Sequence, residues 1–595
     1  MADGSKTVAV LAEKPSVARD IAKVLGASTK GDGFLHGNGY VVTWAIGHLA
    51  ALAQPHEINA AWKYWKRETL PMLPREWPLV VYEKTKDQFE VVRKILTSPK
   101  VERVVCATDA GREGELIFRY IYEAAGSEKP VERLWVSSLT ADAIKKGFHE
   151  LKPGREYDGL ADAARGRSRA DWLVGMNLSR AYSLAFGEDL SVGRVQTPTL
   201  AMVVERELAI RAFVPEEYVE VVATFHPQGR EAEAQYKGTW FRERRPGEDK
   251  EKLQQSMRLA ADGQEAASIV ERTRTGAAAI ESLEQSTQRM APPAFYDLTE
   301  LQRHANRLYG FSAQKTLDLA QALYERHKLL SYPRTDSRHL SQTVAATLPR
   351  VVKTVSGAYL DLLAAGTGER PLGRRFVDDA KVSDHHAIIP TATPPERATL
   401  NGDEKKIYDL GCRRLMRAWH GDYVTAVTTV ITAVRSESAV DRFHASGTAV
   451  VELGWKVLDV APPKKKAKED EEQKLPGGLA EGQAQDVVDV EAVKKKTRAP
   501  KRFTEATLLT AMETAGKTLD EKELSDAMKE SGLGTPATRA AIIEVLLKRA
   551  YIERVGKSLQ ATEKGIRLIE VVHPEVKSPA MTGQWEAFLG RIHKG

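Results

Sequence analysis

The chain begins with strand and helix patterns in alternation. Residues 8–11 form a short apolar run that predicts a buried strand, and a helix is predicted from about 15 to 25, with Pro15 near its first turn. Residues 101–107 repeat the apolar run, and an amphipathic helix follows through 117–121. Strands that alternate with helices predict an α/β region built on a parallel sheet. Polar residues just past the carboxyl ends of such strands lie where open α/β sheets bind ligands.

The rest of the chain interleaves helical and strand patterns. The pattern is helical at 157–211, strand-like at 215–280, helical in two parts at 298–329 with a break near Gly310, strand-like at 424–460, and helical again from 503. Residues 462–482 hold a lysine run beside an acidic run and are predicted to be a solvated loop. Because a strand-rich region is split by a helical one, we expect nested domains, with the chain leaving one domain and later returning to it. A closed loop of domains is one such arrangement.

Composition narrows the class of protein. A chain of 595 residues is too long for one core and indicates about three to five domains. A hydrophobic content of 42% and a charged content of 28% are those of an ordinary soluble globular protein. Cys106 and Cys412 are the only cysteines, which excludes a disulfide scaffold and a four-cysteine zinc ribbon. Since the sequence shows no apolar signal-peptide region and no stretch able to span a bilayer, we expect a cytoplasmic protein.

The charge is informative only locally. The net charge of +6 is mild, so any nucleic-acid surface must come from clustering of basic residues. Lysine and arginine outnumber the acidic residues between 299 and 338, where His304 and His327 add to the cluster. A solvated helix face would have the same composition, so charge alone leaves both interpretations open.

The run Leu330–Ser337 surrounds a tyrosine with unusual neighbours. A phenol with its ordinary pKa of about 10 is a poor nucleophile at neutral pH. Tyr332 precedes a proline, which favours an extended backbone, and alternate side chains of an extended segment share a face. Tyr332, Arg334 and Asp336 are therefore expected to point the same way. Arg334 could then hold a phosphate in its planar fork while the Tyr332 oxygen attacks it. Taken alone, the run also fits a strand end with a buried tyrosine.

Acidic residues follow both predicted strands of the α/β region. Glu13 comes after the first strand, and the run Asp109–Glu115 comes after the second. We expect these carboxylates to face each other across neighbouring strand ends, where their hard oxygens suit Mg²⁺. A metal there can orient nucleic acid and offset developing charge. For Asp109 or Glu113 alone, the first turn of a helix is an equally good explanation.

A predicted helix carries a face of arginines. Arg165 and Arg169 are four residues apart, as are Arg167 and Asp171, so each pair shares a face of the helix. Such a face can hold a phosphate backbone, with Asp171 fixing the arginines. The alternative is a surface helix with internal ion pairs.

Two loops and a histidine run could also contact phosphate. Residues 191–198 and 532–539 are rich in hydrogen-bond donors and glycine and could cradle a phosphate, although helix-capping turns have much the same composition. Ser383–Pro390 holds adjacent histidines, and the flanking aspartate could orient one ring toward a phosphate. His48 is open to the same two interpretations, a phosphate contact or a packed residue.

These motifs, in this order, resemble those of type IA DNA topoisomerases, and of bacterial topoisomerase III most closely. The resemblance covers nearly the whole chain, and its tyrosine motif and acidic run are the most specific parts. The matching segments are Glu13–Ser16, Asp109–Glu115, Ser191–Gln196, Ser331–Ser337, Ser383–Pro390 and Gly532–Thr535.

The resemblance implies a multidomain fold of α/β, α and β parts arranged as a torus of four domains, with an N-terminal Toprim domain that has a parallel sheet. The implied domains are 1–155 for the Toprim domain (I), 156–215 and 497–595 for a helical domain IV with a single-strand groove, 216–285 and 405–496 for a strand-rich arch (II), and 286–404 for domain III with the tyrosine.

The resemblance also implies residue roles. Tyr332 would attack a single-stranded phosphodiester and become linked to the 5′ phosphate, Arg334 would stabilise the cleaved phosphate, and His385 would contact it. Glu13 and Lys14 would lie beside the leaving oxygen. The implied ligands of Mg²⁺ are Glu13, Asp109 and Glu113. The implied DNA contacts are His48, Arg167, Arg169, Asp171, Ser191, Gly193, Arg194, Gln196, Thr535 and Thr538.

The implied activity needs no ATP, because transesterification to tyrosine conserves the energy of the phosphodiester bond. The sequence agrees, since it contains no Gly-x-x-x-x-Gly-Lys-[Ser/Thr] loop. The expected substrates are single-stranded DNA and supercoiled or catenated duplex DNA. A helicase and a single-strand-binding protein are possible partners. We expect a monomer that acts at the nucleoid and not at a membrane.

Two departures from the family pattern stand out. The family often has Asp-x-Asp-x-Glu in the acidic run, but here the middle aspartate is Gly111. With one negative ligand missing, we expect weaker metal binding or more bound water. The sequence also shows no cysteine-rich tail after Gly595, so we expect a core or a truncated form.

Two other classes of function remain open at this point. A Toprim nuclease or primase would use Glu13 and Asp109 without a tyrosine nucleophile. A single-strand-binding clamp would keep the basic grooves and lack the chemistry. A denaturant-resistant adduct between the protein and a 5′ DNA end separates all three classes.

Overall fold

The computed structural model describes residues 6–136, 140–231, 234–242, 250–382, 384–460, 473–519, 522–528 and 532–595. Several sequence-based expectations fall partly outside these ranges: the N-terminal residues 1–5, Ser383 of the histidine run, 462–472 of the predicted loop, and short stretches of the predicted strand region 215–280 and of the helical region from 503. No helix in the described ranges combines the length and the apolar character needed to cross a membrane.

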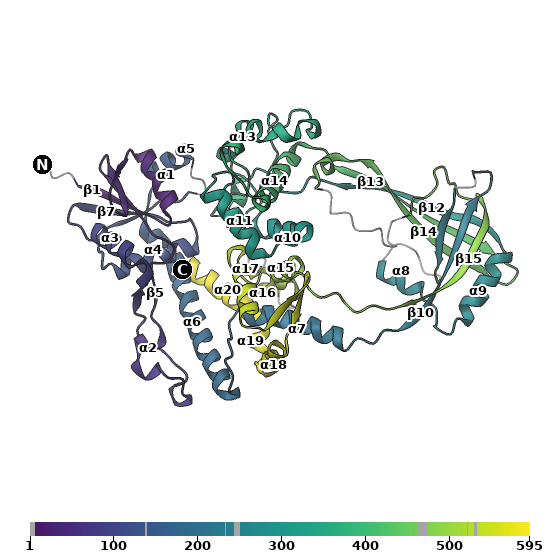
Figure 1. Cartoon of the computed structure of the whole chain (residues 1–595), viewed down its shortest axis with the longest axis horizontal. Helices are drawn as coiled ribbons and strands as arrows, with labels where there is room; N and C mark the ends of the chain where they lie inside the picture. The colour runs from purple at the N-terminus through teal and green to yellow at the C-terminus, as the bar shows by residue number, and fades with distance from the viewer. Residues whose placement is uncertain are drawn as a thin grey trace.

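A seven-stranded sheet forms the N-terminal part (Figure 1). Its central strands run parallel, as predicted, whereas its edge strands pair antiparallel, so the sheet is mixed. The strands that end at Gly37 and begin at Tyr40 are joined by a two-residue turn. Such a short connection can join only antiparallel neighbours, which accounts for one antiparallel edge. The strand order is β2 (Thr29–Lys30), β3 (Phe34–Gly37), β4 (Tyr40–Trp44), β1 (Thr7–Ala12), β7 (Val101–Ala107), β8 (Val131–Arg133) and β9 (Lys152–Pro153).

Helices cover both faces of this sheet. Strand β1 sends Ala9 and Leu11 into one core and Val8, Val10 and Ala12 into the other, so a continuous apolar run is buried on both sides. One core is closed by α3 (Lys86–Leu96) and α4 (Arg112–Ala124), and the other by α1 (Pro15–Leu25) and α5 (Ala141–His149).

The turns that follow β1 and β7 place the acidic residues. Helix α1 begins at Pro15, as predicted, so Glu13 and Lys14 lie in the short turn between strand and helix. Strand β7 pairs parallel with β1 and ends at Ala107, just before Asp109. Because the two strands are neighbours, their carboxyl ends present these residues side by side.

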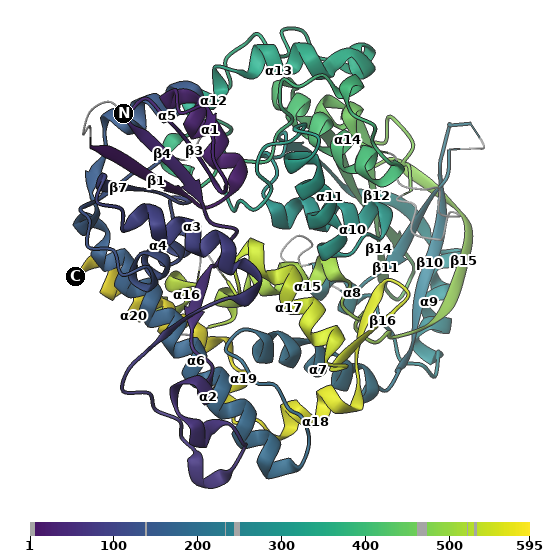
Figure 2. The ribbon, with the colours of Figure 1, turned by 60° about the vertical axis from the view of Figure 1, so that its left-hand side comes forward.

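Two distant segments build one helical core. Helix α6 (Asp158–Phe186) packs along α20 (Pro579–Lys594), and a single hydrophobic core contains residues of both 190–204 and 508–576. Figure 2 shows the C-terminal helices beside α6 and α7 (Gln196–Arg211). The prediction of helices at 157–211 is confirmed.

The C-terminal region also includes α15 (Glu505–Glu513), α17 (Pro536–Lys548) and α18 (Glu563–Val571). It is not wholly helical, because β16 (Ile552–Val555) and β17 (Ser558–Ala561) form a hairpin. The two-residue turn contains Gly556, whose φ of 62° suits such a turn.

Six strands close into a barrel at the far end of the molecule (Figure 1). The predicted strand region 215–280 also holds two helices, α8 (Lys250–Ser256) and α9 (Gln264–Thr275). Helix α9 buries residues at helical spacing, Ala266, Ile269, Val270 and Thr273, and this period of three to four residues outweighs the strand pattern around it. The barrel order is β10 (Glu217–Pro227), β11 (Tyr236–Trp240), β14 (Val440–Glu452), β13 (Tyr423–Arg435), β12 (Ala277–Met290) and β15 (Ala484–Lys496).

The segment with Tyr332 lies between the barrel, the N-terminal sheet and the C-terminal helices (Figures 1 and 2). Its two predicted helices are confirmed as α10 (Leu298–Tyr309) and α11 (Ala313–Glu325), separated at Gly310, whose φ of 69° ends α10 in a left-handed cap. Helix α14 (Gly402–Met416) shares their core.

We predict that Gly114→Ala disturbs the loop after β7. A Cβ added to Gly114 in α4 would lie 2.2 Å from the backbone oxygen of Asp109, so the helix or the loop must shift. We expect a loss of about 1–3 kcal/mol in the free energy of unfolding, measured by urea titration. Gly175→Ala in α6 is the matched control, since nothing lies within 4 Å of its added Cβ. That change should stabilise the protein by about 0.5–1 kcal/mol. Equal effects of the two substitutions would contradict the packing described for Gly114.

Candidate active site

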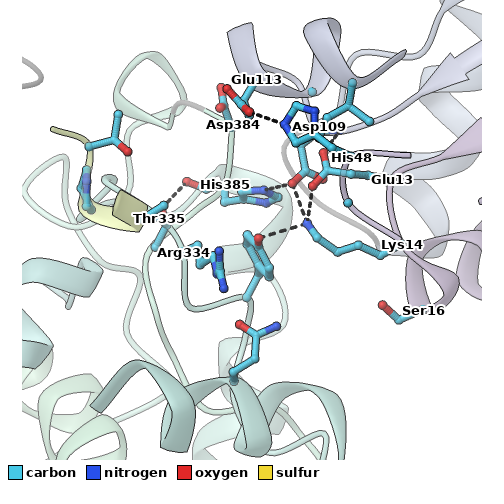
Figure 3. Close-up of a pocket in the computed structure, with 18 of the residues that line it drawn as sticks. Glu13, Lys14, Ser16, His48, Asp109, Glu113, Arg334, Thr335, Asp384 and His385 are labelled. Carbon is cyan, nitrogen blue, oxygen red and sulfur yellow. Dashed lines mark hydrogen bonds and ion pairs between the residues drawn. The ribbon is translucent and has the colours of Figure 1, made fainter. Parts of the chain in front are cut away.

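A cavity of about 860 Å³ opens where the N-terminal sheet meets the Tyr332 segment and the start of α17. It brings together most of the residues that the tyrosine and acidic motifs single out (Figure 3). The sequence-predicted residues that line it are Glu13, Lys14, His48, Asp109, Glu113, Arg167, Tyr332, Arg334, His385, Thr535 and Thr538.

The side chain of Lys14 links the acidic residues to the tyrosine. Its Nζ lies 2.9 Å from Glu13 Oε1 and 2.8 Å from Asp109 Oδ2. The same ammonium group donates a hydrogen bond of 3.0 Å to the hydroxyl oxygen of Tyr332, 318 residues further along the chain. The acidic run and the tyrosine motif are therefore joined directly through one cation.

A second contact joins the two parts through His385. Its Nε2 lies 3.2 Å from Asp109 Oδ2, and its ring centroid lies 4.3 Å from that of Tyr332. The Asp109 backbone N–H also donates to Glu13 Oε2 at 3.2 Å. Figure 3 shows Lys14, His385 and Glu13 converging on Asp109.

The predicted face of the tyrosine motif is confirmed. Pro333, Thr335 and Ser337 are buried, whereas the alternate residues are half-buried or exposed. Tyr332, Arg334 and Asp336 all line the cavity, which Thr335 also reaches, and the alternating burial is that of an extended backbone. The ring of Tyr332 also packs edge-on against Tyr324, at 5.3 Å between ring centroids. The tyrosine is therefore held between ring neighbours and does not lie in a closed core.

Electrostatics keep the phenol protonated and the lysine charged. Burial raises the pKa of Tyr332 above its ordinary value, and Lys14 only partly offsets this. Burial acts to lower the pKa of Lys14, but the carboxylates of Asp109 and Glu13 outweigh it and raise that pKa. The pKa of Glu13 is raised by burial and by the nearby charge of Asp109. Burial opposes ionisation of Asp109 too, yet hydrogen bonds from His385 and Lys14 hold its pKa well below the usual range.

The proposed metal ligands have suitable chemistry but are only partly assembled. Glu13 and Asp109 converge, whereas Glu113 pairs with His48 at 2.6 Å and its side chain is 71% exposed. Within the described part of the chain, no three His, Cys, Asp or Glu side chains are close enough together to hold a metal ion. The donor set still fits Mg²⁺, since Glu13, Asp109 and Glu113 offer hard carboxylate oxygens around one cavity.

The arginine-rich helix α6 takes part in a network of ion pairs around Glu586, a residue that sequence analysis missed. Arg194 Nε donates to Asp171 at 2.9 Å, and Arg194 Nη1 lies 3.5 Å from Glu586. Arg112 also pairs with Glu586, at 3.0 Å, while Arg167 lies 3.9 Å from Asp171. Glu586 is the one acidic residue of α20, and no local pattern in the sequence links it to these arginines.

Other predicted DNA contacts lie outside the cavity. Gln196 Nε2 donates to Ser191 Oγ at 2.9 Å, and the Gly193 N–H donates to Thr197, so this loop is closed on itself. Arg169 is exposed over the ring of Trp77.

Arg165, on the same helix, pairs with Asp162 of that helix and with Glu123 of α4. At the cavity, Thr535 and Thr538 form a capping box at the start of α17, which confirms that this loop opens a helix.

A second residue that sequence analysis missed is Arg133, which is almost fully buried at the end of β8. Its guanidinium pairs with Glu115 at 3.1 Å and donates 2.7 Å to the Asp109 backbone oxygen. It also donates to the backbone oxygens of Cys106, Thr108 and Leu134. Arg133 thereby fixes the loop that presents Asp109, and nothing in its sequence context indicates this.

We predict that Glu586→Ala weakens the joint between the N-terminal sheet and the helical core. The substitution removes a carboxylate shared by Arg194, whose side chain is 2% exposed, and Arg112. We expect a loss of about 2 kcal/mol in the free energy of unfolding, measured by urea titration. Glu570→Ala is the control, because Glu570 is an exposed acid on α18 and should change stability by less than about 0.5 kcal/mol. Equal losses in the two variants would contradict the role assigned to Glu586.

Comparison with known proteins agrees with this geometry. Residues 8–139 match the Toprim domain family, and residues 155–595 match the DNA topoisomerase family. DNA topoisomerase 3 of Shouchella clausii is 42% identical over 599 aligned positions, which cover 99% of this chain and 78% of that protein. DNA topoisomerase 3 of Bacillus subtilis is 42% identical over 598 positions, covering 99% of this chain and 79% of that protein.

The fold also matches a solved structure. Full-length topoisomerase I from Thermotoga maritima superposes with a TM-score of 0.66 at 23% identity, covering 99% of this chain and 87% of that one. The family match spans most of the chain, and it places the Toprim domain where the acidic residues converge on Lys14. The chain therefore belongs to the type IA DNA topoisomerases, a family of DNA-binding isomerases.

Proposed function

We propose that this protein is an ATP-independent topoisomerase of the topoisomerase 3 type. It would cleave one DNA strand through a 5′-phosphotyrosine, pass DNA through the break and religate it, which relaxes negative supercoils and separates catenated circles. One observation supports this above all: Lys14 Nζ lies 3.0 Å from the Tyr332 hydroxyl and 2.8 Å from Asp109. A nuclease or primase does not require a tyrosine beside its acidic residues. A binding clamp requires neither the tyrosine nor the acidic residues.

The chemistry follows from the groups that meet in the cavity. The Tyr332 oxygen would attack a phosphorus held by Arg334 and His385, forming the O–P bond while the bond to the 3′ oxygen breaks. The Lys14 ammonium, already bonded to the phenol oxygen, would stabilise the phenolate that forms. The phenol loses one proton and the 3′ oxygen gains one.

When bound, Mg²⁺ would supply positive charge that offsets the charge developing on the phosphate. The protein residues we assign to it are Glu13, Asp109 and Glu113, all of which line the cavity. Single-stranded DNA would reach this point along α6, with Arg167, Asp171 and Arg194 on one side and the capping threonines of α17 on the other. Arg169, Ser191, Gly193, Gln196 and His48 would contact it further out.

The arrangement of the parts supports a gate. We propose the four-domain torus described above, with 1–155 as domain I, 156–215 and 497–595 as domain IV, 216–285 and 405–496 as domain II, and 286–404 as domain III. Helix α14 packs with α10 and α11, so we extend domain III to the end of α14 and begin the second part of domain II after it. Domain III touches domain I through Tyr332 and His385, and it is continuous with the barrel through β12 and β13. Separating those contacts, together with the contacts that domain III makes with the C-terminal helices, would open the ring for strand passage.

The proposed substrates are single-stranded DNA and supercoiled or catenated duplex DNA. Working on such DNA would place the enzyme at the nucleoid in the cytoplasm, as a monomer. Single-stranded regions there are made by helicases and covered by single-strand-binding proteins, which are therefore the proposed partners.

We predict that Tyr332→Phe abolishes the covalent adduct. Labelled single-stranded DNA is incubated with the protein and Mg²⁺, denaturant is added, and protein joined to a 5′ end is measured on a gel. The variant loses the attacking oxygen, so we expect no adduct and at most about a threefold change in the dissociation constant for single-stranded DNA.

Tyr82→Phe serves as the control, because Tyr82 is 48% exposed and does not line the cavity, and its adduct should match that of the parent. An adduct that survives Tyr332→Phe would exclude Tyr332 as the nucleophile and overturn the proposal.

A further inference from the structure

The space beside Gly111 is filled by a carboxylate from another part of the chain. A Cβ added to Gly111 would lie 2.0 Å from Asp384 Oδ2, 2.5 Å from its Cγ and 2.7 Å from its Oδ1. In the Asp-x-Asp-x-Glu pattern that the resemblance implies, an aspartate would stand at this position, where the chain has Gly111. The carboxyl group of Asp384 thus stands where the side chain of that aspartate would begin.

Backbone conformation does not explain the glycine. Gly111 has φ −158° and ψ 178°, an extended conformation that any residue adopts. What excludes a side chain at this position is the presence of Asp384, since a Cβ cannot approach a carboxylate oxygen to 2.0 Å. The small residue in the acidic run and the aspartate of the histidine run therefore fit each other.

We propose that Asp384 supplies the carboxylate that Gly111 lacks, and that the Mg²⁺ site is therefore shared between the Toprim domain and the Tyr332 segment. This inference rests on the proposed magnesium site. It replaces the expectation that one negative ligand is simply missing from this chain.

The surroundings of Asp384 favour a ligand role. The residue lines the same cavity as Glu13, Asp109 and Glu113 (Figure 3). The next residue, His385, bonds to Asp109 at 3.2 Å, which anchors the histidine run against the acidic run. Within the described ranges, no hydrogen bond and no ion pair within 4 Å engages the Asp384 carboxylate, so its oxygens are available to a cation.

The charges around Asp384 also call for a cation. Asp336 and Asp109 repel its carboxylate, and attraction comes from His385 and Arg133. Arg133 is already committed to Glu115 and to four backbone oxygens. A divalent ion among Asp109, Glu13 and Asp384 would offset the repulsion on the Asp384 carboxylate, whereas Lys14 already bridges Glu13 and Asp109.

Sharing the site has a consequence for the gate. Glu13 and Asp109 belong to the N-terminal sheet, whereas Asp384 moves with Tyr332. A ligand that binds the closed arrangement better than the open one shifts the population toward closure. The ion would therefore bind most tightly when the tyrosine is in place, and bound ion would hold the ring closed.

The test measures ion binding directly, with Mn²⁺ as the probe. Free Mn²⁺ is followed by electron paramagnetic resonance in titrations of the parent, Asp384→Asn, Glu13→Gln and the control Asp361→Asn, with Mg²⁺ as competitor. Asp361 is an exposed aspartate in the same part of the chain and does not line the cavity. We expect Asp384→Asn to weaken binding by about tenfold or more, and Asp361→Asn to leave it unchanged. Circular dichroism confirms that each variant is folded.

A swap of positions sharpens the test. Gly111→Asp alone sets two carboxylates in one place and should weaken binding, whereas Gly111→Asp combined with Asp384→Ala should restore affinity to within about threefold of the parent. Parent-like binding by Asp384→Asn overturns the inference. A loss that the double variant does not recover also overturns it, because Asp384 would then act only by orienting His385.

The variant Glu13→Gln distinguishes failure of this inference from failure of the proposed magnesium site. Loss of Mn²⁺ binding in Glu13→Gln together with parent-like binding in Asp384→Asn would leave the magnesium site standing and remove only Asp384 from it. Parent-like binding in both variants would remove the magnesium site itself, and the shared ligand with it.

Discussion

The site depends on the contacts that the Lys14 ammonium group makes with Glu13, Asp109 and Tyr332. Two carboxylates, Glu13 and Asp109, face each other at neighbouring strand ends, and without a cation between them they would repel. Two unit charges 4 Å apart interact by about 4 kcal/mol at the effective dielectric near a protein surface, which is large against the stability of a typical domain. Because the same group also bonds to Tyr332, one charge both holds the acidic pair together and positions the nucleophile.

Sequence analysis predicted the parts of this site that depend on local rules. The strand ends at Glu13 and Asp109 follow from apolar runs and turns, and the face shared by Tyr332 and Arg334 follows from alternation before and after a proline. Residues whose partners lie far along the chain were missed. Glu586 and Arg133 meet their partners only after the chain has folded back, and a single sequence carries no pattern that links them. For Asp384, the sequence predicted only a role in orienting a histidine ring.

The same limit explains the corrections to the fold. Helix α9 and the hairpin of β16 and β17 are short elements inside regions with a different dominant pattern, so their own signal was outweighed. The closed barrel could not be anticipated either, because its strand order joins segments more than two hundred residues apart. In contrast, the return of the chain to the core of α6 and α7 was expected from the interleaved patterns, and the shared core confirms that expectation.

The surface between the Tyr332 segment and the C-terminal helices includes several polar contacts beside the apolar packing of Ala313. Arg303 pairs with Glu513, and Glu505 and Arg539 bond to the Ala313 N–H and the Thr299 hydroxyl. Polar groups of this kind regain hydrogen bonds to water when the surface separates, which lowers the free-energy cost of opening. The ion pair between Arg303 and Glu513 weakens as ionic strength rises, because mobile counterions screen it over about 8–10 Å. The ionic strength therefore affects how easily the Tyr332 segment separates from the C-terminal helices, independently of the chemistry at the tyrosine.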